Sequence, residues 1–132
     1  MNQHNAVFKF ALIGSIGFIA DAVLFSMALY LYELDVFFSR VIAFFGATCI
    51  TWFGNRCYTF VHSNKQPRFL QWAKFLGSAS ISAIPNFIVF KAVLSVISEG
   101  PISVYVALIL GVLVGMLSNY MLSSQWVFRS KY

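Results

Sequence analysis

The chain has 132 residues, of which 60% are hydrophobic and only 10% are charged. Soluble domains carry about 25% charged residues and rarely expose large apolar patches, so this composition excludes an ordinary water-soluble domain. The net charge of +5 is compatible with nucleic acid binding. However, most basic residues gather near the two termini and around one loop, and three of the four acids lie in the two other loops. This is the positive-inside pattern of a membrane protein, and we expect no nucleic-acid partner.

Four apolar segments follow one another along the chain, at about residues 8–31, 41–60, 69–97 and 102–128. Each reaches the roughly 20 residues that a helix needs to cross ~30 Å of hydrocarbon. Helices are expected because a strand edge in lipid would leave backbone groups unpaired. The sequence therefore predicts an all-α membrane protein, a four-transmembrane-helix bundle that occupies residues 1–132 as a single domain.

The connections between the segments predict the topology. Residues 61–68 are basic, whereas Glu33, Asp35 and Glu99 lie in the other two connections. Because basic loops stay in the cytoplasm, both termini are predicted to be cytoplasmic (N-in, C-in). The first segment is too long for a secretory signal and is interrupted by Asp21, so we expect it to be retained as a helix.

The two halves of the chain resemble each other, which indicates a duplication. Lys9-Phe10 aligns with Lys74-Phe75 at a shift of 65 residues, and the same shift aligns Asp21 with Asn86. The aromatic ends of the second and fourth segments align at a shift of 68 residues. Each half crosses the membrane twice, so both enter from the same side. We therefore expect two helical hairpins related as a parallel repeat.

Asp21 is the polar residue that lipid should exclude most strongly. A charged side chain there costs several kcal/mol if it faces hydrocarbon, so it should face protein or water. Gly14, Gly17 and Asp21 also share one helical stripe. Two interpretations stay open: a structural carboxyl, neutral or paired with Asn86, or a functional group in binding or proton coupling. We prefer the second, because ionisable groups inside membranes often mark transport pathways.

Each other segment carries a similar stripe of small and polar residues. The stripes are Thr48, Thr51 and Asn55; Ser78, Ser82 and Asn86; and Gly111, Gly115 and Ser118, followed by Asn119. Helix packing alone explains the small residues, and a GxxxG spacing specifies no activity. Gly14, Gly17, Gly111 and Gly115 are thus candidates for packing or oligomer contacts, and Asn55, Asn86 and Asn119 are candidates for substrate contacts.

The basic residues are candidates for binding phosphate. Arg40 and Lys91 lie toward the predicted outer side, where snorkelling to the headgroups is the alternative. A denser set lies on the predicted inner side: Arg56, Lys65, Arg68 and Lys74. Attraction to anionic lipids explains the inner set by itself. A phosphate-bearing substrate would use the same charges, with arginine as a bidentate clamp.

Motifs for catalysis are missing from the sequence. It contains no Ser-His-Asp arrangement, P-loop or HExxH motif, and both histidines lie in polar segments. The two cysteines, Cys49 and Cys57, have no metal-binding spacing. We therefore expect no enzyme activity, no metal and no cofactor.

The most distinctive segments are residues 8–25, with a Lys-Phe opening, paired glycines and a mid-helix Asp; residues 39–60, which close with Asn-Arg-Cys-Tyr-Thr-Phe; and residues 118–128. With these features the chain resembles the GtrA-like family of small four-helix membrane proteins. The second half has Ser123-Ser124-Gln125 where the first has Asn55-Arg56-Cys57, so it lacks a matching arginine. The resemblance implies a cytoplasmic-membrane protein that moves a polyprenyl-phosphate-linked monosaccharide to the outer leaflet. There a membrane glycosyltransferase uses it for cell-surface polysaccharide.

Three hypotheses follow. In the first, the chain is a translocator whose polar stripes line a groove open sideways to the bilayer, with basic residues binding the phosphate and Asp21 and the asparagines contacting the head. In the second, it only anchors or positions the glycosyltransferase. In the third, it is a small proton-coupled exporter, which its firm charge bias disfavours. The expected partners are the polyprenyl-phosphate sugar, membrane lipids, the glycosyltransferase and a second copy in a homodimer, with Gly111 and Gly115 as a candidate contact.

Overall fold

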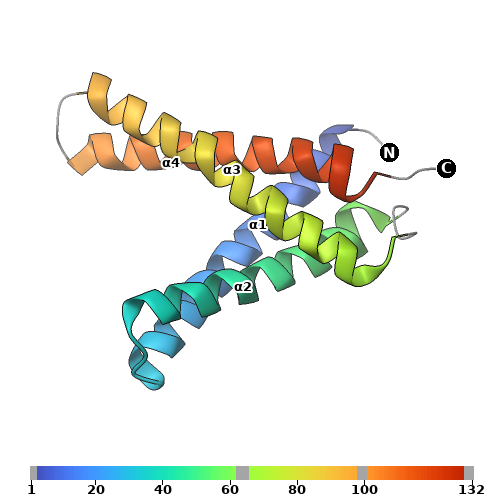
Figure 1. Ribbon diagram of the computed structural model, residues 1–132. Coiled ribbons are helices and arrows are strands. Elements are labelled where there is room, and N and C mark those ends of the chain that lie inside the picture. Colours follow the sequence, from blue (N-terminus) through green and yellow to red (C-terminus); the bar gives the residue numbers. More distant parts are fainter. Residues whose placement is uncertain (1–2, 62–65, 98–100, 130–132) are drawn as a thin grey trace. The chain divides into compact units, whose positions relative to one another are not determined.

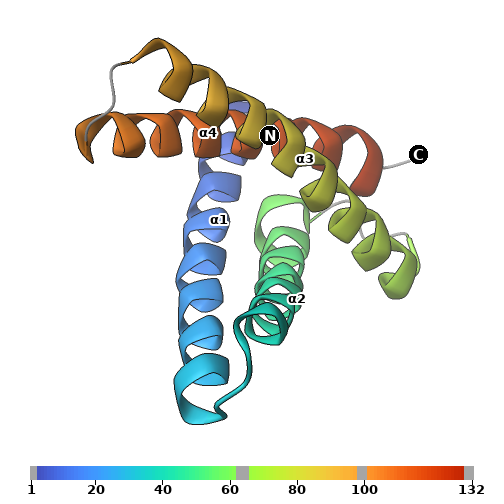
Figure 2. The same cartoon turned by 60° about the vertical axis from the view of Figure 1, so that its left-hand side comes forward.

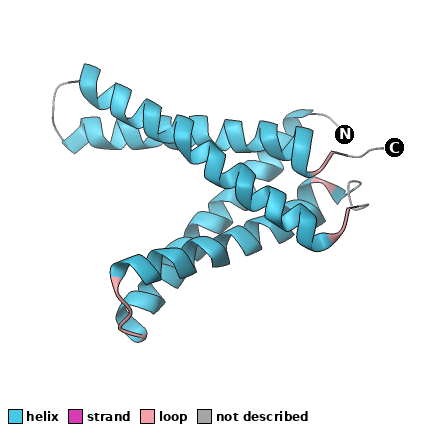
Figure 3. Ribbon diagram, viewed as in Figure 1, coloured by secondary structure: helices cyan, strands magenta, loops and turns pink. Residues whose placement is uncertain are grey.

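Long helices joined by short loops make up this computed structural model, which describes residues 3–61, 66–97 and 101–129 (Figures 1 and 3). The helices are α1 (Gln3–Ser26), α2 (Val36–Gly54), α3 (Arg68–Val96) and α4 (Pro101–Leu122). Three of them continue into a π-helical turn: η1 (Met27–Leu31), η2 (Asn55–Thr59) and η4 (Ser123–Val127). The chain forms two compact units, one reaching to Trp72 and one spanning Ala73–Arg129. Each unit is described by itself below.

Four helices are long and apolar enough to cross a membrane: Asn5–Leu31, Phe37–Thr59, Arg68–Val96 and Val106–Val127. Their large apolar side chains are widely exposed, as at Phe8 and Phe18, which are 71% and 73% exposed. Such a surface requires lipid around it. The predicted all-α fold with four transmembrane helices is therefore confirmed, while the N-in, C-in orientation stays a prediction.

In the first unit, α1 and α2 form a hairpin (Figure 2). The turn places Glu33 in the left-handed region, with φ of 52°. Asp35 then caps α2, because its Oδ1 accepts hydrogen bonds from the backbone N–H groups of Phe37 and Phe38 at 2.8 and 3.2 Å. This cap starts α2 at Val36, five residues before the start that hydropathy suggested.

The two helices of this hairpin approach closely at glycines. A Cβ added to Gly17 would lie 2.0 Å from Cγ2 of Thr51, and one added to Gly54 would lie 2.9 Å from Cγ2 of Ile13. Gly14, by contrast, has no neighbouring atom within 4 Å of such a Cβ. Gly17 and Gly54 therefore set the α1–α2 contact, whereas Gly14 does not take part in it.

In the second unit, α3 and α4 run side by side as another hairpin (Figures 1 and 2). Gly111 and Gly115 of α4 pack against Asn86 of α3: a Cβ on Gly111 would lie 2.6 Å from its Oδ1, and one on Gly115 would lie 2.9 Å from its Cβ. Both glycines are buried. Their close-approach face is thus used inside the hairpin, so the predicted dimer would need a contact elsewhere.

Both hairpins end in the same way, as the duplication predicts. The backbone N–H of Phe60 bonds the carbonyl oxygen of Asn55 at 2.8 Å, and that of Phe128 bonds the carbonyl oxygen of Ser123 at 2.8 Å. These wide turns close η2 and η4, which lie 68 residues apart. The two positions that the duplication matches therefore share one turn type, and η1 at the end of α1 is a third turn of this kind.

A matching aromatic pair locks each hairpin next to its π-turn. The rings of Phe10 and Phe60 meet edge to face with centroids 6.2 Å apart, and those of Phe75 and Phe128 do so at 6.0 Å. All four side chains are buried. Edge-to-face pairs add about 0.5–1.5 kcal/mol beyond area burial, so each pair ties the start of its first helix to the end of its second.

Candidate functional site

Asp21 and Arg40 form an ion pair within the first hairpin, between α1 and the second turn of α2. Arg40 Nη1 donates to Asp21 Oδ2 at 2.9 Å, and the two side chains are 55% and 22% exposed. The guanidinium carbon of Arg40 also lies 5.5 Å from the centre of the Phe25 ring. The carboxyl therefore faces protein, as its position in the helix requires. Its partner within this hairpin is Arg40, which extends from the helix that packs against α1.

Arg56 marks the other end of the same hairpin. Its Nη1 donates a hydrogen bond to Oε1 of Gln71, a fully buried residue in the first turn of α3. Its guanidinium carbon lies 5.8 Å from the centre of the Trp52 ring. Sequence reasoning missed Gln71, although an amide inside an apolar segment was a signal for a buried polar partner. These contacts hold the cation of Arg56 in a defined place within η2.

Asn55 is deeply buried within η2. It is 1% exposed, and its Oδ1 accepts a hydrogen bond from Thr59 Oγ1 at 2.8 Å. Its backbone carbonyl closes the π-turn. The structure thus places this predicted substrate contact inside the hairpin, where it stabilises the turn that carries Arg56.

Asn119 is likewise engaged inside the second hairpin. Its Oδ1 accepts hydrogen bonds from Ser78 Oγ at 2.8 Å and Ser123 Oγ at 3.3 Å. One turn farther along α3, the hydroxyls of Ser82 and Ser118 meet at 3.4 Å. Together with Asn86 against its two glycines, these contacts use the polar stripes of α3 and α4 for packing within the hairpin.

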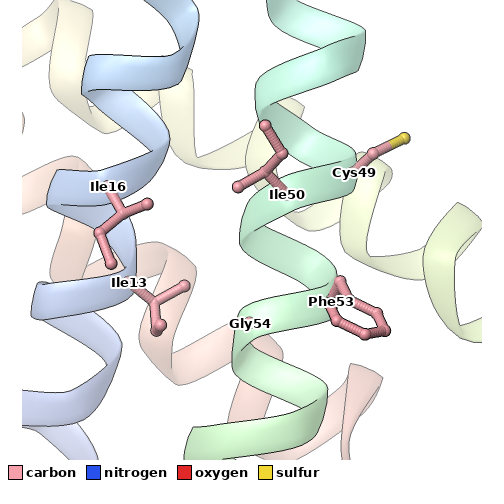
Figure 4. A pocket seen from close by; sticks show the side chains of 6 residues that line it. All are labelled: Ile13, Ile16, Cys49, Ile50, Phe53 and Gly54. Carbon is pink, nitrogen blue, oxygen red and sulfur yellow. The ribbon is translucent and has the colours of Figure 1, made fainter.

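A groove of about 450 Å³ lies along α1 and α2 (Figure 4). It is lined by Ile13, Ile16, Cys49, Ile50, Phe53 and Gly54. In Figure 4 the side chains of Ile13 and Ile16 extend toward α2, whereas Phe53 extends away from α1. The lining is apolar, which differs from the polar groove expected from the sequence. Thr48 and Thr51 of α2 instead donate to carbonyl oxygens of their own helix, and the groove is lined by apolar side chains.

Comparison with known proteins decides the family. A family model described as GtrA/DPMS, transmembrane domain, matches residues 9–128. The chain belongs to this family. No curated protein and no solved structure matches the chain. Membership makes it a multi-pass membrane protein and connects it with the handling of polyprenyl-phosphate sugars.

The residues that suggested the GtrA/DPMS family meet at one end of the first hairpin. The Nζ of Lys9 lies 4.8 Å from the centre of the Tyr58 ring, next to the Phe10–Phe60 pair. The Lys-Phe opening of α1 therefore packs on the closing motif of α2. Two cations, Lys9 and Arg56, lie on this family motif, each against an aromatic ring.

The remaining basic residues of this GtrA/DPMS chain have different surroundings. Lys91 is exposed on α3 and forms no ion pair within the ranges that the structure covers. Arg68 is exposed at the start of α3, and Lys74 is half-buried one and a half turns later. Lys65 lies outside the described residues. Within the first unit, the structure therefore brings Asp21 and Arg40 together and gives Arg56 a buried amide partner.

Proposed function

We propose that the chain translocates a polyprenyl-phosphate-linked monosaccharide across the cytoplasmic membrane for cell-surface polysaccharide synthesis. Family membership supports the class of substrate. The observation that carries the proposal is the pair of arginines on α2 and η2. Arg40 and Arg56 are 16 residues apart, or roughly 24 Å at 1.5 Å per helical residue. This approaches the ~30 Å thickness of the hydrocarbon, so one hairpin offers a cation near each leaflet.

In this mechanism the phosphate binds first at the cytoplasmic side. Arg56, oriented by Gln71, supplies planar donors that match a phosphate, and Lys65, Arg68 and Lys74 add positive charge nearby in the sequence. Arg40 receives the head at the outer leaflet. The orientation follows the positive-inside rule, with both termini in the cytoplasm. Lys91 is a second outer cation in the proposal.

The lipid tail needs no polar passage, because it stays in hydrocarbon. The apolar groove at Ile50 and Phe53 lies between the two arginines along α2 and suits a segment of the prenyl chain. The amides of Asn55 and Asn119 are already engaged in their hairpins. A sugar hydroxyl would therefore bind Asn55 or Asn119 by replacing one of these hydrogen bonds. To reach Asn86, it would have to displace the packing of this residue against Gly111 and Gly115.

Reconstitution in liposomes tests this function. A labelled polyprenyl-phosphate sugar should exchange between leaflets with the wild-type protein, and Arg56→Gln should slow the exchange at least about tenfold, since a charged hydrogen bond contributes about 1.5–3 kcal/mol. Arg129→Gln is the matched control, because it removes an arginine near the same predicted side that the mechanism does not use. Equal exchange in wild-type, Arg56→Gln and empty vesicles would refute translocation.

A second candidate function is a non-transporting anchor for a glycosyltransferase. It is favoured by the apolar lining of the groove and by the use of the polar stripes for packing. Its signature would be co-purification with that enzyme, whose activity would survive substitution of Asp21, Asn86 and Asn119. The third candidate, a proton-coupled exporter, is disfavoured because the Asp21 carboxylate is paired with Arg40.

A further inference from the structure

The ion pair between Asp21 and Arg40 leaves most of the arginine available. A guanidinium has five N–H donors in a planar fork, and a single bond, from Nη1 to Oδ2, joins it to the carboxylate. The Arg40 side chain is 55% exposed. Phe25 lies against the guanidinium on another side. Arg40 is therefore held in place, partly neutralised, with donors still open to an anion.

A carboxylate and a phosphate compete for the same fork, because both bind a guanidinium through paired oxygens. Asp21 is 22% exposed and belongs to α1, the helix that packs on α2. The nearest other acid in the sequence, Asp35, uses its Oδ1 to cap α2 at the N–H groups of Phe37 and Phe38. Within the residues that the structure describes, Asp21 is the acid that forms an ion pair with Arg40.

We propose that Asp21 acts as a competing carboxylate that lowers the affinity of Arg40 for the phosphate of a prenyl lipid. This inference rests on the proposed translocation and specifies how the outer site is regulated. An unopposed arginine at the edge of hydrocarbon would hold a phosphate tightly. Return of the Asp21 carboxylate to Arg40 displaces the phosphate, so the head is released to the outer leaflet. Asp21 is therefore a positioning residue that acts through Arg40.

The direction in which phosphate affinity changes when the charge of Asp21 is removed separates this role from a purely structural one. If Asp21 only stabilises the hairpin, removing its charge should weaken binding or leave it unchanged. If it competes, removing its charge should strengthen binding. The second hairpin carries Asn86 at the position that the duplication matches to Asp21, so Asp21→Asn is the natural substitution.

The experiment titrates full-length protein in phosphatidylcholine nanodiscs with a short prenyl phosphate and, separately, with inorganic phosphate. Asp21→Asn should bind prenyl phosphate roughly two- to fivefold tighter, the range expected for loss of a partly exposed ion pair. The gain should vanish in Asp21→Asn/Arg40→Gln. Asp35→Asn is the matched control: it removes the same charge near the same end of the hairpin, yet asparagine caps a helix as well as aspartate does, so its affinity should equal wild type.

Unchanged or weaker binding by folded Asp21→Asn would overturn the proposal, as would an equal gain in Asp35→Asn. If Asp21→Asn binds both ligands more tightly, the proposal is supported and Arg40 recognises the phosphate group without the prenyl chain. If it binds only inorganic phosphate more tightly, the proposal that the ligand is a prenyl lipid is overturned. If Asp21→Asn does not fold, Asp21→Ser answers the same question. If Asp21→Asn shows no gain in affinity while the wild-type protein exchanges the lipid between leaflets, only this inference fails. If exchange with the wild-type protein equals that of empty vesicles, the proposed translocation itself fails.

Discussion

Replacing Gly17 by alanine tests whether the close α1–α2 contact sets the geometry of the first hairpin. The new Cβ would lie 2.0 Å from Cγ2 of Thr51, about 1.5 Å short of the roughly 3.5 Å at which carbon atoms make contact. Thr51 cannot turn aside freely, because its hydroxyl donates to the carbonyl oxygens of Ala47 at 2.9 Å and Thr48 at 3.1 Å. Either the helices must separate or these hydrogen bonds must break.

The expected cost follows from two opposing effects. Overpacking costs about 1–3 kcal/mol, and the better helix propensity of alanine returns up to about 1 kcal/mol. With the full offset, Gly17→Ala should therefore lower the free energy of unfolding by about 0–2 kcal/mol, with about 1 kcal/mol as the central expectation. Unfolding in mixed detergent micelles, followed by tryptophan fluorescence, measures this.

Two further variants make the test specific. Thr51→Ala removes Cγ2 and leaves only Cβ, which lies 3.5 Å from the added atom, so the double variant Gly17→Ala/Thr51→Ala should regain most of the loss. Gly14→Ala, which meets nothing within 4 Å, should be neutral or slightly stabilising. A Gly17→Ala protein as stable as Gly14→Ala, or a double variant with no recovery, would refute the predicted contact.

Three other predictions concern the cap, the second hairpin and the groove. Asp35→Ala should lower stability by about 1 kcal/mol in thermal unfolding through loss of the α2 cap, and an unaltered melt would contradict the capping role. A double-mutant cycle of Ser78→Ala and Asn119→Ala should give a coupling of about 0.6 kcal/mol, the average for hydrogen bonds between membrane helices; zero coupling would argue against that bond. Ile50→Trp should fill the groove and slow leaflet exchange in liposomes, whereas Ile42→Trp, at a similarly exposed site outside the groove, should not. Equal rates in the two tryptophan variants would remove the groove from the mechanism.

The sequence by itself determined the membrane fold and the repeat. Hydropathy fixes four spans because lipid admits only long apolar helices. The 68-residue shift aligned the aromatic ends of the second and fourth segments, which include Phe60 and Phe128. That both ends close in a π-turn was visible only in the structure. The start of α2 was also encoded, in Asp35 as a capping residue, but apolar periodicity alone pointed to a later start.

Only the tertiary structure decided which polar groups meet. Asp21 and Arg40 lie 19 residues apart, and their contact depends on the register of α1 against α2. That register is set by close packing, as at Gly17 and Thr51, which hydropathy does not encode. The same packing turns polar stripes inward and leaves the groove apolar. Hydrophobicity is a property that each residue carries locally, whereas an ion pair requires two side chains to be brought within a few ångströms, and only the assembled helices do this.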